Sequence, residues 1–480
     1  MRTRDFVFVV VTVIVMSCLT VAGNDAGKSG DLYEHYQTFS RIVTSVKNNY
    51  VEEVDTQKLF YGAFSGMLQT LDPHSAFLPP EEKEDLEIET TGEFGGLGIE
   101  ITLDKHGVLT VVTPLEDTPA FKAGVLAADR IIRIEDKSTK GITIREAVNK
   151  LRGPKGSPVK ITVLHENGKI EDITIIRDII KPKSIKDPHF VDGKQKIAYL
   201  RLTSFQKHSA EDLDIAVKEL EAKGMKALVI DLRANPGGLL DAAIDISDRF
   251  LAEGVIVSTK GRKSLPRTFK ATKSATYADF PIAVLISRHS ASAAEIFAGA
   301  VQDHKRGVIV GMRTYGKGSV QSLIKLEDGK SAIRLTTAHY YTPSGRLIHR
   351  NPNNPDQTEW GIDPDIEVKL TPEEEFALWT DWRDRHKAEV REKNGPKNGK
   401  DNKPEKKNGE PKKKDEPKKE PPKPDADDDW IPAKPYDDAD KKDEQPKEFH
   451  DRTLEAAVNA LKGMILAQVR LAPAEKKAAK

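Results

Sequence analysis

The chain of 480 residues has a single cysteine, Cys18, and no formal net charge, because 75 lysines and arginines balance 75 aspartates and glutamates. One cysteine excludes an intrachain disulfide framework and a cysteine-based zinc site. The zero balance gives no indication of a nucleic-acid partner, so any basic patch has to be local. Apolar residues make up only 38% of the chain, which indicates that a polar segment dilutes an ordinary core. At roughly 150 residues per domain, the length suggests about three domains.

The N-terminus has the pattern of an export signal. Two arginines precede the apolar run 6–15, and small residues follow it, in the order of a secretory signal peptide. Cleavage after Ala22 would remove Cys18. Two alternatives stay open: residues 15–18 resemble a lipobox, which would place a lipid on Cys18, and segment 1–23 could remain as a short membrane anchor. All three place the body outside the cytoplasm, in the periplasm or cell envelope.

Periodicity and composition divide the rest of the chain. Apolar residues recur at helical spacing, then in short β runs, and then in strands that alternate with helices. Continuous apolar strands such as 227–230 and 282–286 favour a sheet covered on both faces, which is an α/β core. We predict a signal or anchor (1–23), a helical region (31–89), a β-rich domain (90–178), an α/β core (179–384), a disordered insertion rich in Lys, Pro and Asp (385–448) and a C-terminal helix that packs back on the body (449–471).

A serine-rich motif lies where a buried strand gives way to a helix. Ser292 and Glu295 have the spacing of a capping box, which would be purely structural. The same position suits a nucleophile, because a serine at this turn lies beside helix amides that can stabilise an oxyanion. His289 is close in sequence, but the chain has no Gly-x-Ser-x-Gly elbow, so a Ser-His-Asp hydrolase is weakly supported.

Two other motifs suggest rival sites. Residues 311–318 nearly spell a P-loop, but Gly318 replaces the Mg²⁺-binding hydroxyl, and residues 320–326 have the pattern of a strand instead of the required helix. Ser322 and Lys325 have the Ser-x-x-Lys spacing of penicillin-binding proteins, which also needs a helix. A nucleotide-binding protein therefore stays only as an alternative.

Two pairs of glycines suit a close approach of backbone amides to a ligand. Gly237 and Gly238 follow a strand that ends in Asp231. The second pair, at 95–96, precedes the first strand of the β-rich domain, which begins at residue 97. Each also fits an ordinary turn or hairpin entry. The functional interpretation is an oxygen-binding turn in the first case, and a carboxylate-binding loop beside an open strand edge in the second.

The motifs and their order resemble the C-terminal processing peptidases, also called tail-specific serine proteases. The resemblance covers nearly the whole chain and rests on Leu-Asp-Pro-His-Ser at 71–75, Gly-Leu-Gly-Ile at 96–99, Asp-Leu-Arg-x-Asn-Pro-Gly-Gly at 231–238, Ser-Ala-Ser-Ala-Ala-Glu at 290–295, Tyr-Gly-Lys-Gly-x-Val-Gln at 315–321 and Asp-x-x-Leu-x-x-Ala at 451–457. It implies a PDZ domain at 90–178 and a ClpP/crotonase-like peptidase core at 179–384.

The resemblance also implies a site. It assigns the nucleophile to Ser292, the base to Lys317, a third catalytic role to Gln321, the oxyanion amides to Gly237, Gly238 and Ala293, a supporting polar role to Asp303, and binding of the substrate's C-terminus to Leu97, Gly98 and Ile99. It implies no metal and no cofactor. The expected partners are polypeptides with apolar or unstructured C-termini, and membrane anchoring and a homo-oligomer stay open.

A Ser/Lys mechanism makes a physical demand on the base. A lysine with a pKa of about 10.4 is almost always charged at neutral pH, so desolvation has to lower that value before Lys317 can accept a proton. The sequence departs from the family where Ala128 precedes Asp129, because the family usually has glycine there. The alternative from another class is a PDZ scaffold whose peptidase core is inert.

Overall fold

The computed structural model describes residues 26–394 and 450–478, apart from Glu116, Glu166, Ser264, 273–276, Ala278, 352–353 and Pro355. The predicted signal or anchor and most of the predicted insertion lie outside these residues. The chain divides into two compact units, Met1–Pro80 with Ser322–Thr336, and Glu81–Gln321 with Thr337–Lys480. Within the described ranges, no helix combines the length and apolar character needed to cross a membrane.

The first unit contains two helices, α2 (Ala26–Asn49) and α3 (Thr56–Gln69), and a short strand, β1 (Ala76–Leu78). Helix α3 begins after Asp55, whose carboxylate accepts the amide of Lys58 at 3.1 Å and so caps the helix. Strand β1 pairs antiparallel with the first residues of β18 (Ala332–Tyr341). The rings of Phe39, Phe60, Phe64 and Phe77 contact one another in series.

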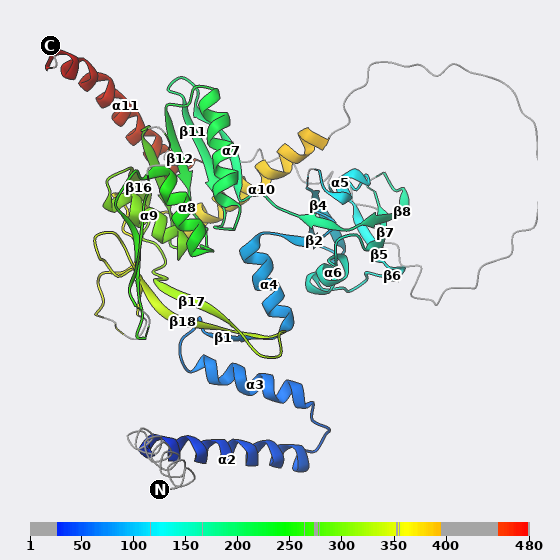
Figure 1. Cartoon of the computed structure of the whole chain (residues 1–480). Coiled ribbons are helices and arrows are strands. Elements are labelled where there is room, and N and C mark those ends of the chain that lie inside the picture. The colour runs from blue at the N-terminus through cyan, green and yellow to red at the C-terminus, as the bar shows by residue number, and fades with distance from the viewer. Residues whose placement is uncertain are drawn as a thin grey trace, which may run out of the picture. The chain divides into compact units, whose positions relative to one another are not determined.

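The second unit begins with α4 (Pro80–Thr91) and the β-rich domain (Figure 1). The elements of this domain are β2 (Phe94–Gly96), β3 (Ile99–Leu103), β4 (Leu109–Pro114), α5 (Pro119–Lys122), β5 (Arg130–Ile134), β6 (Lys137–Ser138), α6 (Ile144–Leu151), β7 (Pro158–Leu164), β8 (Ile170–Ile176) and β9 (Asp178–Ile180). The antiparallel sheet has the order β3-β4-β5-β7-β8, with β6 on β5, so β3 lies at one edge. Val111, Ile131 and Ile161 are fully buried in its core.

The α/β core follows. Its elements are β10 (Ile185–Asp192), β11 (Ile197–Leu202), α7 (Ser209–Ala222), β12 (Ala227–Asp231), α8 (Leu240–Phe250), β13 (Val255–Lys260), β14 (Arg267–Lys270), β15 (Ile282–Ile286), α9 (Ala293–Asp303), β16 (Val308–Gly311), β17 (Ser319–Lys325), β19 (Ile366–Glu367), α10 (Pro372–Asn394) and α11 (Arg452–Ala478). The main sheet has the order β10-β11-β12-β15-β16-β19, in which β11 to β19 are parallel and β10 is antiparallel. Helix α10 extends into the segment that the sequence assigns to the insertion.

Helices cover both faces of this sheet. Successive side chains of a strand point to opposite faces, so neighbouring residues of one strand pack in different clusters. Leu228 and Ile230 of β12 belong to the core cluster that includes helices α7, α8 and α9. Val229, between them, packs in a separate cluster with Ala457 and Leu461 of α11. The predicted fold class, an α/β core with a β-rich domain and an N-terminal helical region, is confirmed.

Candidate active site

Ser292 lies between strand β15 and helix α9, as the residue immediately before the helix. Its backbone has φ 55° and ψ −113°, and only 8% of the residue is exposed. A positive φ is costly for a residue other than glycine, and such strain is typical of functional sites. The Ser292 amide donates to Glu295 Oε2 at 2.7 Å. This bond is the Glu295 half of the predicted capping box.

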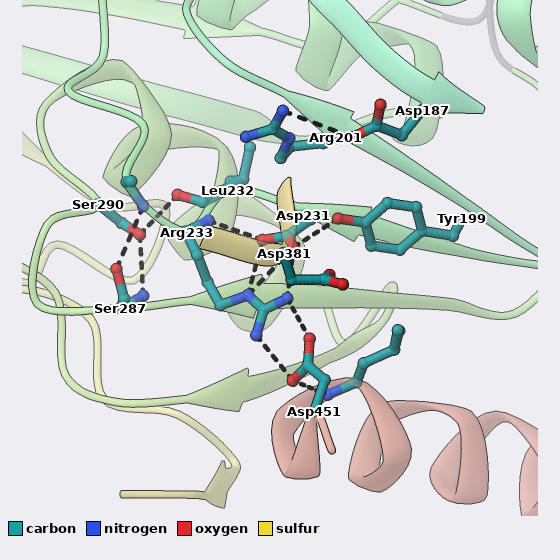
Figure 2. Close-up of polar contacts among 12 residues, drawn as sticks. Asp187, Tyr199, Arg201, Asp231, Leu232, Arg233, Ser287, Ser290, Asp381 and Asp451 are labelled. Carbon is teal, nitrogen blue, oxygen red and sulfur yellow. Dashed lines mark hydrogen bonds and ion pairs between the residues drawn. The ribbon is translucent and has the colours of Figure 1, made fainter. Parts of the chain in front are cut away.

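The nearby Ser290 is engaged away from the helix end. Its hydroxyl donates to the carbonyl of Leu232 at 2.8 Å and accepts from the amide of Ser287 at 2.9 Å (Figure 2). Ser290 is completely buried. It therefore ties the loop before Ser292 to the end of strand β12 instead of capping α9.

Glu295 connects the loop of Ser292 with the loop of Lys317. Its Oε1 accepts from the hydroxyl of Thr314 at 2.5 Å and from the amide of Gly316 at 2.7 Å. Its Oε2 accepts from the amides of Ser292 and Lys317, at 2.7 and 2.8 Å. Complete burial raises the pKa of this carboxyl to about 6, although the four hydrogen bonds oppose the rise. One buried carboxylate thus fixes the backbone on both sides of the site.

Lys317 lies in the loop between β16 and β17 and is half-buried. The Tyr315 amide donates to the carbonyl of Ser290 at 3.0 Å, which brings this loop against the nucleophile loop. A Cβ on Gly316 would lie 2.8 Å from Cβ of Arg350, and one on Gly318 would lie 2.2 Å from the backbone nitrogen of His349. The two glycines therefore allow the tight path that positions Lys317.

The two remaining polar candidates lie in different places. Gln321 is on β17, and its Nε2 donates to Ser319 Oγ at 2.8 Å. Asp303 is the last residue of α9, roughly 15 Å along the helix axis from its first residue. Its carboxylate accepts from the Ser344 amide at 2.8 Å and pairs with Arg346 at 2.7 Å. Asp303 therefore holds the loop after β18, away from Ser292.

The glycine turn after β12 lies against Ser292. A Cβ on Gly237, which has φ +102°, would come within 2.8 Å of Ser292 Cβ and 2.9 Å of the Ala293 nitrogen. The Gly237 amide donates to Asn235 Oδ1 at 2.8 Å. Gly238 packs its backbone on Phe205. Ala293 is the first residue of α9, where an amide has no acceptor within the helix.

The carboxylate-binding loop predicted in the β-rich domain opens strand β3. Gly98 has φ +77°, and a Cβ there would lie 2.3 Å from Cβ of Thr118, so glycine is required. Leu97 is 2% exposed and its side chain belongs to the domain core, so that side chain is not available to a ligand. Ile99 is the first residue of the edge strand.

The rival motifs lack the helices that they need. The segment after Gly318 is strand β17, and a P-loop requires a helix at this point. Ser322 and Lys325 lie on the same strand. Among the residues with described positions, no group of three or more His, Cys, Asp or Glu side chains is arranged to hold a metal ion.

Glu295 is the residue whose role the sequence reading underestimated. The Ser292–Glu295 spacing indicated a helix cap, but not that the same carboxylate also binds the backbone at Gly316 and Lys317. One signal was present in the sequence: Glu295 is the only charged residue in the otherwise apolar stretch 293–301. A charged side chain at a buried helical position needs several partners, which can come from a distant loop.

Three family models match this chain: Peptidase family S41 over residues 196–368, PDZ domain over 95–176, and the activating protease CtpB N-terminal domain over 17–82. The β-rich domain is therefore a PDZ domain. Its match ends two residues before the predicted boundary at 178.

Curated relatives agree with these matches. The carboxy-terminal-processing protease of Bartonella bacilliformis is 44% identical over 376 residues, which cover 77% of this chain and 82% of that protein. The carboxy-terminal processing protease CtpA of Bacillus subtilis is 32% identical over 380 residues, 77% of this chain and 78% of that protein. A solved photosystem II D1 C-terminal processing protease is 29% identical, with a TM-score of 0.40 over 69% of this chain and 86% of its own. The chain belongs to peptidase family S41 and is a serine peptidase of the carboxy-terminal processing kind.

Proposed function

We propose that the protein is an exported endopeptidase in which Ser292 attacks the peptide bond and Lys317 is the base. The observation that carries the proposal is the Glu295 carboxylate, which binds the backbone amides of Ser292 and Lys317 at once. Among the described residues, Ser292 is the only serine with a positive φ, and in a serine peptidase of this family the shared carboxylate supports pairing it with the loop of Lys317. Export rests on the charge and apolar pattern of residues 1–23.

The reaction follows from these roles. Neutral Lys317 takes the hydroxyl proton of Ser292 as the serine oxygen attacks the carbonyl carbon, and the resulting oxyanion accepts from backbone amides at the start of α9 and the glycine turn. Collapse breaks the C–N bond, the lysine proton passes to the leaving amine, and an acyl-enzyme forms. Water, deprotonated by the same lysine, then attacks the acyl carbon. The bond to the Ser292 oxygen breaks, and the lysine returns the proton to that oxygen.

The other predicted residues support this reaction. The Nε2 group of Gln321 donates to Ser319 Oγ, and the carbonyl oxygen of the same side chain would accept from the lysine amine. Ala293 and Gly238 offer their amides to the oxyanion, and Gly237 joins them if its amide leaves Asn235 when substrate binds. Asp303 acts indirectly, through the loop that it holds.

The PDZ domain selects the substrate. The backbone at Leu97, Gly98 and Ile99 would bind the C-terminal carboxylate of a polypeptide, and the open edge of β3 would pair with its extended chain. Ile99 would contact the last side chain, which favours apolar C-termini. Polypeptides with unstructured ends are the expected substrates because only an extended segment can add to a strand edge.

Cleavage of a denatured protein with an apolar C-terminus tests the proposal. Ser292→Ala and Lys317→Ala should each abolish cleavage while the circular dichroism spectrum stays unchanged. Ser322→Ala and Lys325→Ala are matched controls on strand β17 and should keep activity. Retained cleavage in both site variants would refute the assignment, and a serine-reactive probe that labels the wild type but not Ser292→Ala would exclude an inert scaffold.

A further inference from the structure

Helix α11 is part of the peptidase core, although a long insertion separates it from the rest of the core. Ala457 and Leu461 are completely buried. They pack in one cluster with Tyr199, Val229 and Leu285, which lie on three different strands. Burial of this apolar face attaches the helix to the side of the sheet opposite α8 and α9. The first turn of α11 therefore has a fixed position relative to the strand ends.

Asp451, immediately before α11, uses one carboxylate for two purposes. Its Oδ1 accepts from the amide of Leu454 at 3.0 Å, which caps the helix. The two oxygens also accept from Arg233, with Nη1 to Oδ1 at 2.9 Å and Nη2 to Oδ2 at 2.7 Å (Figure 2). Although burial raises it, the Arg233 guanidinium holds the pKa of the Asp451 carboxyl below its usual range.

Arg233 is buried between two carboxylates. Its Nε and Nη2 donate to Asp231 at 3.0 and 2.7 Å, and the Tyr199 hydroxyl donates to the same carboxylate at 2.8 Å. Trp382 of α10 covers the guanidinium, with the ring centroid 5.5 Å away. Asp231 already neutralises the charge of Arg233, so the second carboxylate is not needed for that purpose. Its effect is to fix the orientation of the guanidinium, because the two bidentate pairs leave one geometry.

The turn that Arg233 begins is hydrogen-bonded to the nucleophile loop. The Leu232 carbonyl accepts from the hydroxyl of Ser290 at 2.8 Å, and the Asn235 carbonyl accepts from the amide of Ala291 at 3.0 Å. Ala234, between these two residues, has φ +59°, a conformation that an alanine keeps only when its surroundings impose it. The turn therefore connects Arg233 by hydrogen bonds to Ala291, the residue directly before Ser292.

We propose that Asp451 is a positioning residue for catalysis: by fixing Arg233, it holds the turn 232–238 and the Ser292 loop in the reactive geometry. The core is then complete only when the C-terminal helix is docked. The inference rests on the proposed function, since it assumes that Ser292 and the glycine turn carry the reaction. It adds a requirement that lies outside the segment 196–368 matched by the peptidase family model.

Asp451→Asn tests the proposal in the full-length protein. The amide keeps an oxygen to cap Leu454, but its NH₂ group would meet a guanidinium N–H, so the bidentate pair is lost. We expect kcat for the denatured protein substrate to fall roughly 10- to 100-fold, with KM changed less than about twofold, because small misplacements at the reacting centre have effects of this size. Glu455→Gln, on the same helix turn with a half-exposed side chain, is the matched control and should keep the wild-type kcat.

Two further measurements separate positioning from folding. Amides of 232–235, 237–238 and 290–292 should exchange hydrogen faster in Asp451→Asn, whereas those of β11 and β15 should keep their protection. The effects of Asp451→Asn and Arg233→Lys on kcat should be non-additive, because both act on one guanidinium. Wild-type kcat and wild-type exchange in Asp451→Asn would overturn the proposal. If Ser292→Ala cleaved as fast as the wild type, the proposed function would be refuted instead. Hydrogen exchange of the turn would still test the role of Asp451.

Discussion

At the scale of single residues, the site depends on a buried carboxylate that does not react. Glu295 accepts four hydrogen bonds and is completely buried, and its partners come from the residue immediately before α9 and from the loop before β17. The four donors and the N-terminus of the helix stabilise the charged form, but they only partly offset the burial that raises the pKa of this carboxyl.

Glu295→Gln should lower kcat by roughly 100-fold. The glutamine NH₂ would face the amide donors of Ser292 and Lys317, so that two buried N–H groups lose their acceptor at a cost of about 1–3 kcal/mol each. Kinetics on the denatured protein substrate measure this effect. Glu219→Gln, at an exposed position on α7, provides the control, and equal kcat in the two variants would show that the carboxylate is dispensable.

The same residue predicts a pH dependence of stability. The pKa of Glu295 is about 6 in the folded protein and 4.5 as the ordinary value, so the folded state favours the protonated form. Its contribution to the free energy of unfolding is therefore fully present below pH 4.5 and is lost as the pH rises through 6, by about 2 kcal/mol. Denaturant unfolding between pH 4.5 and 7 should show this loss in the wild type but not in Glu295→Gln. Parallel pH curves for the two proteins would contradict the assignment.

Ala128 occupies the position where the family usually has glycine, and it has φ +68°. The left-handed conformation costs alanine about 1–2 kcal/mol, whereas glycine loses about 0.5–1 kcal/mol more conformational freedom on folding. Ala128→Gly should therefore stabilise the PDZ domain by about 0.5–1 kcal/mol, as measured by denaturant-dependent hydrogen exchange of β4 and β5. Ala123→Gly, at a right-handed position, should destabilise it, and a loss of stability in both variants would contradict this account.

At the scale of elements, the site forms where the ends of neighbouring parallel strands meet. Strand β12 leads into the glycine turn, β15 into the Ser292 loop and β16 into the Lys317 loop, and these three strands are adjacent in the sheet. Parallel strands end at the same edge, so residues more than fifty positions apart in sequence come together there. Glycine at 237 allows the first two loops to touch.

Gly237→Ala tests this contact between elements. The new Cβ would overlap Ala291 O, Ser292 Cβ and the Ala293 nitrogen, which lie at 2.7 to 2.9 Å. Relief of such crowding costs about 1–3 kcal/mol, so kcat should fall about 10- to 100-fold. Gly224→Ala is the matched control, because Gly224 has φ +87° with no atom within 4 Å of a Cβ and therefore tests backbone strain alone. Similar activity in the two variants would show that the contact is unimportant.

Much of this arrangement could be predicted from the sequence. The strands at 227–230 and 282–286 and the helix after the serine-rich motif are recognisable, because a buried parallel strand is a continuous apolar run and the helix follows one directly. Helix α10 was missed, since its many charges resemble those of the insertion that follows. The contacts of Glu295 with Lys317 and of Asp451 with Arg233 could not be predicted, because they join positions 22 and 218 residues apart through the topology of the sheet.

At the scale of the whole molecule, the chain combines an S41 peptidase core, a PDZ domain and an N-terminal helical region. The core itself is assembled from distant parts, because α11 covers one face of the sheet and Asp451 binds the turn beside the proposed nucleophile. Activity should therefore depend on segments well outside the loops that carry Ser292 and Lys317.

The most direct test of the central claim is mass spectrometry of the intact protein during turnover of a peptide ester, followed by peptide mapping. The account predicts a covalent acyl adduct on Ser292 that forms in the wild type, is absent in Ser292→Ala and does not accumulate in Lys317→Ala. An adduct on another residue, or undiminished turnover in Lys317→Ala, would contradict the proposed Ser/Lys mechanism.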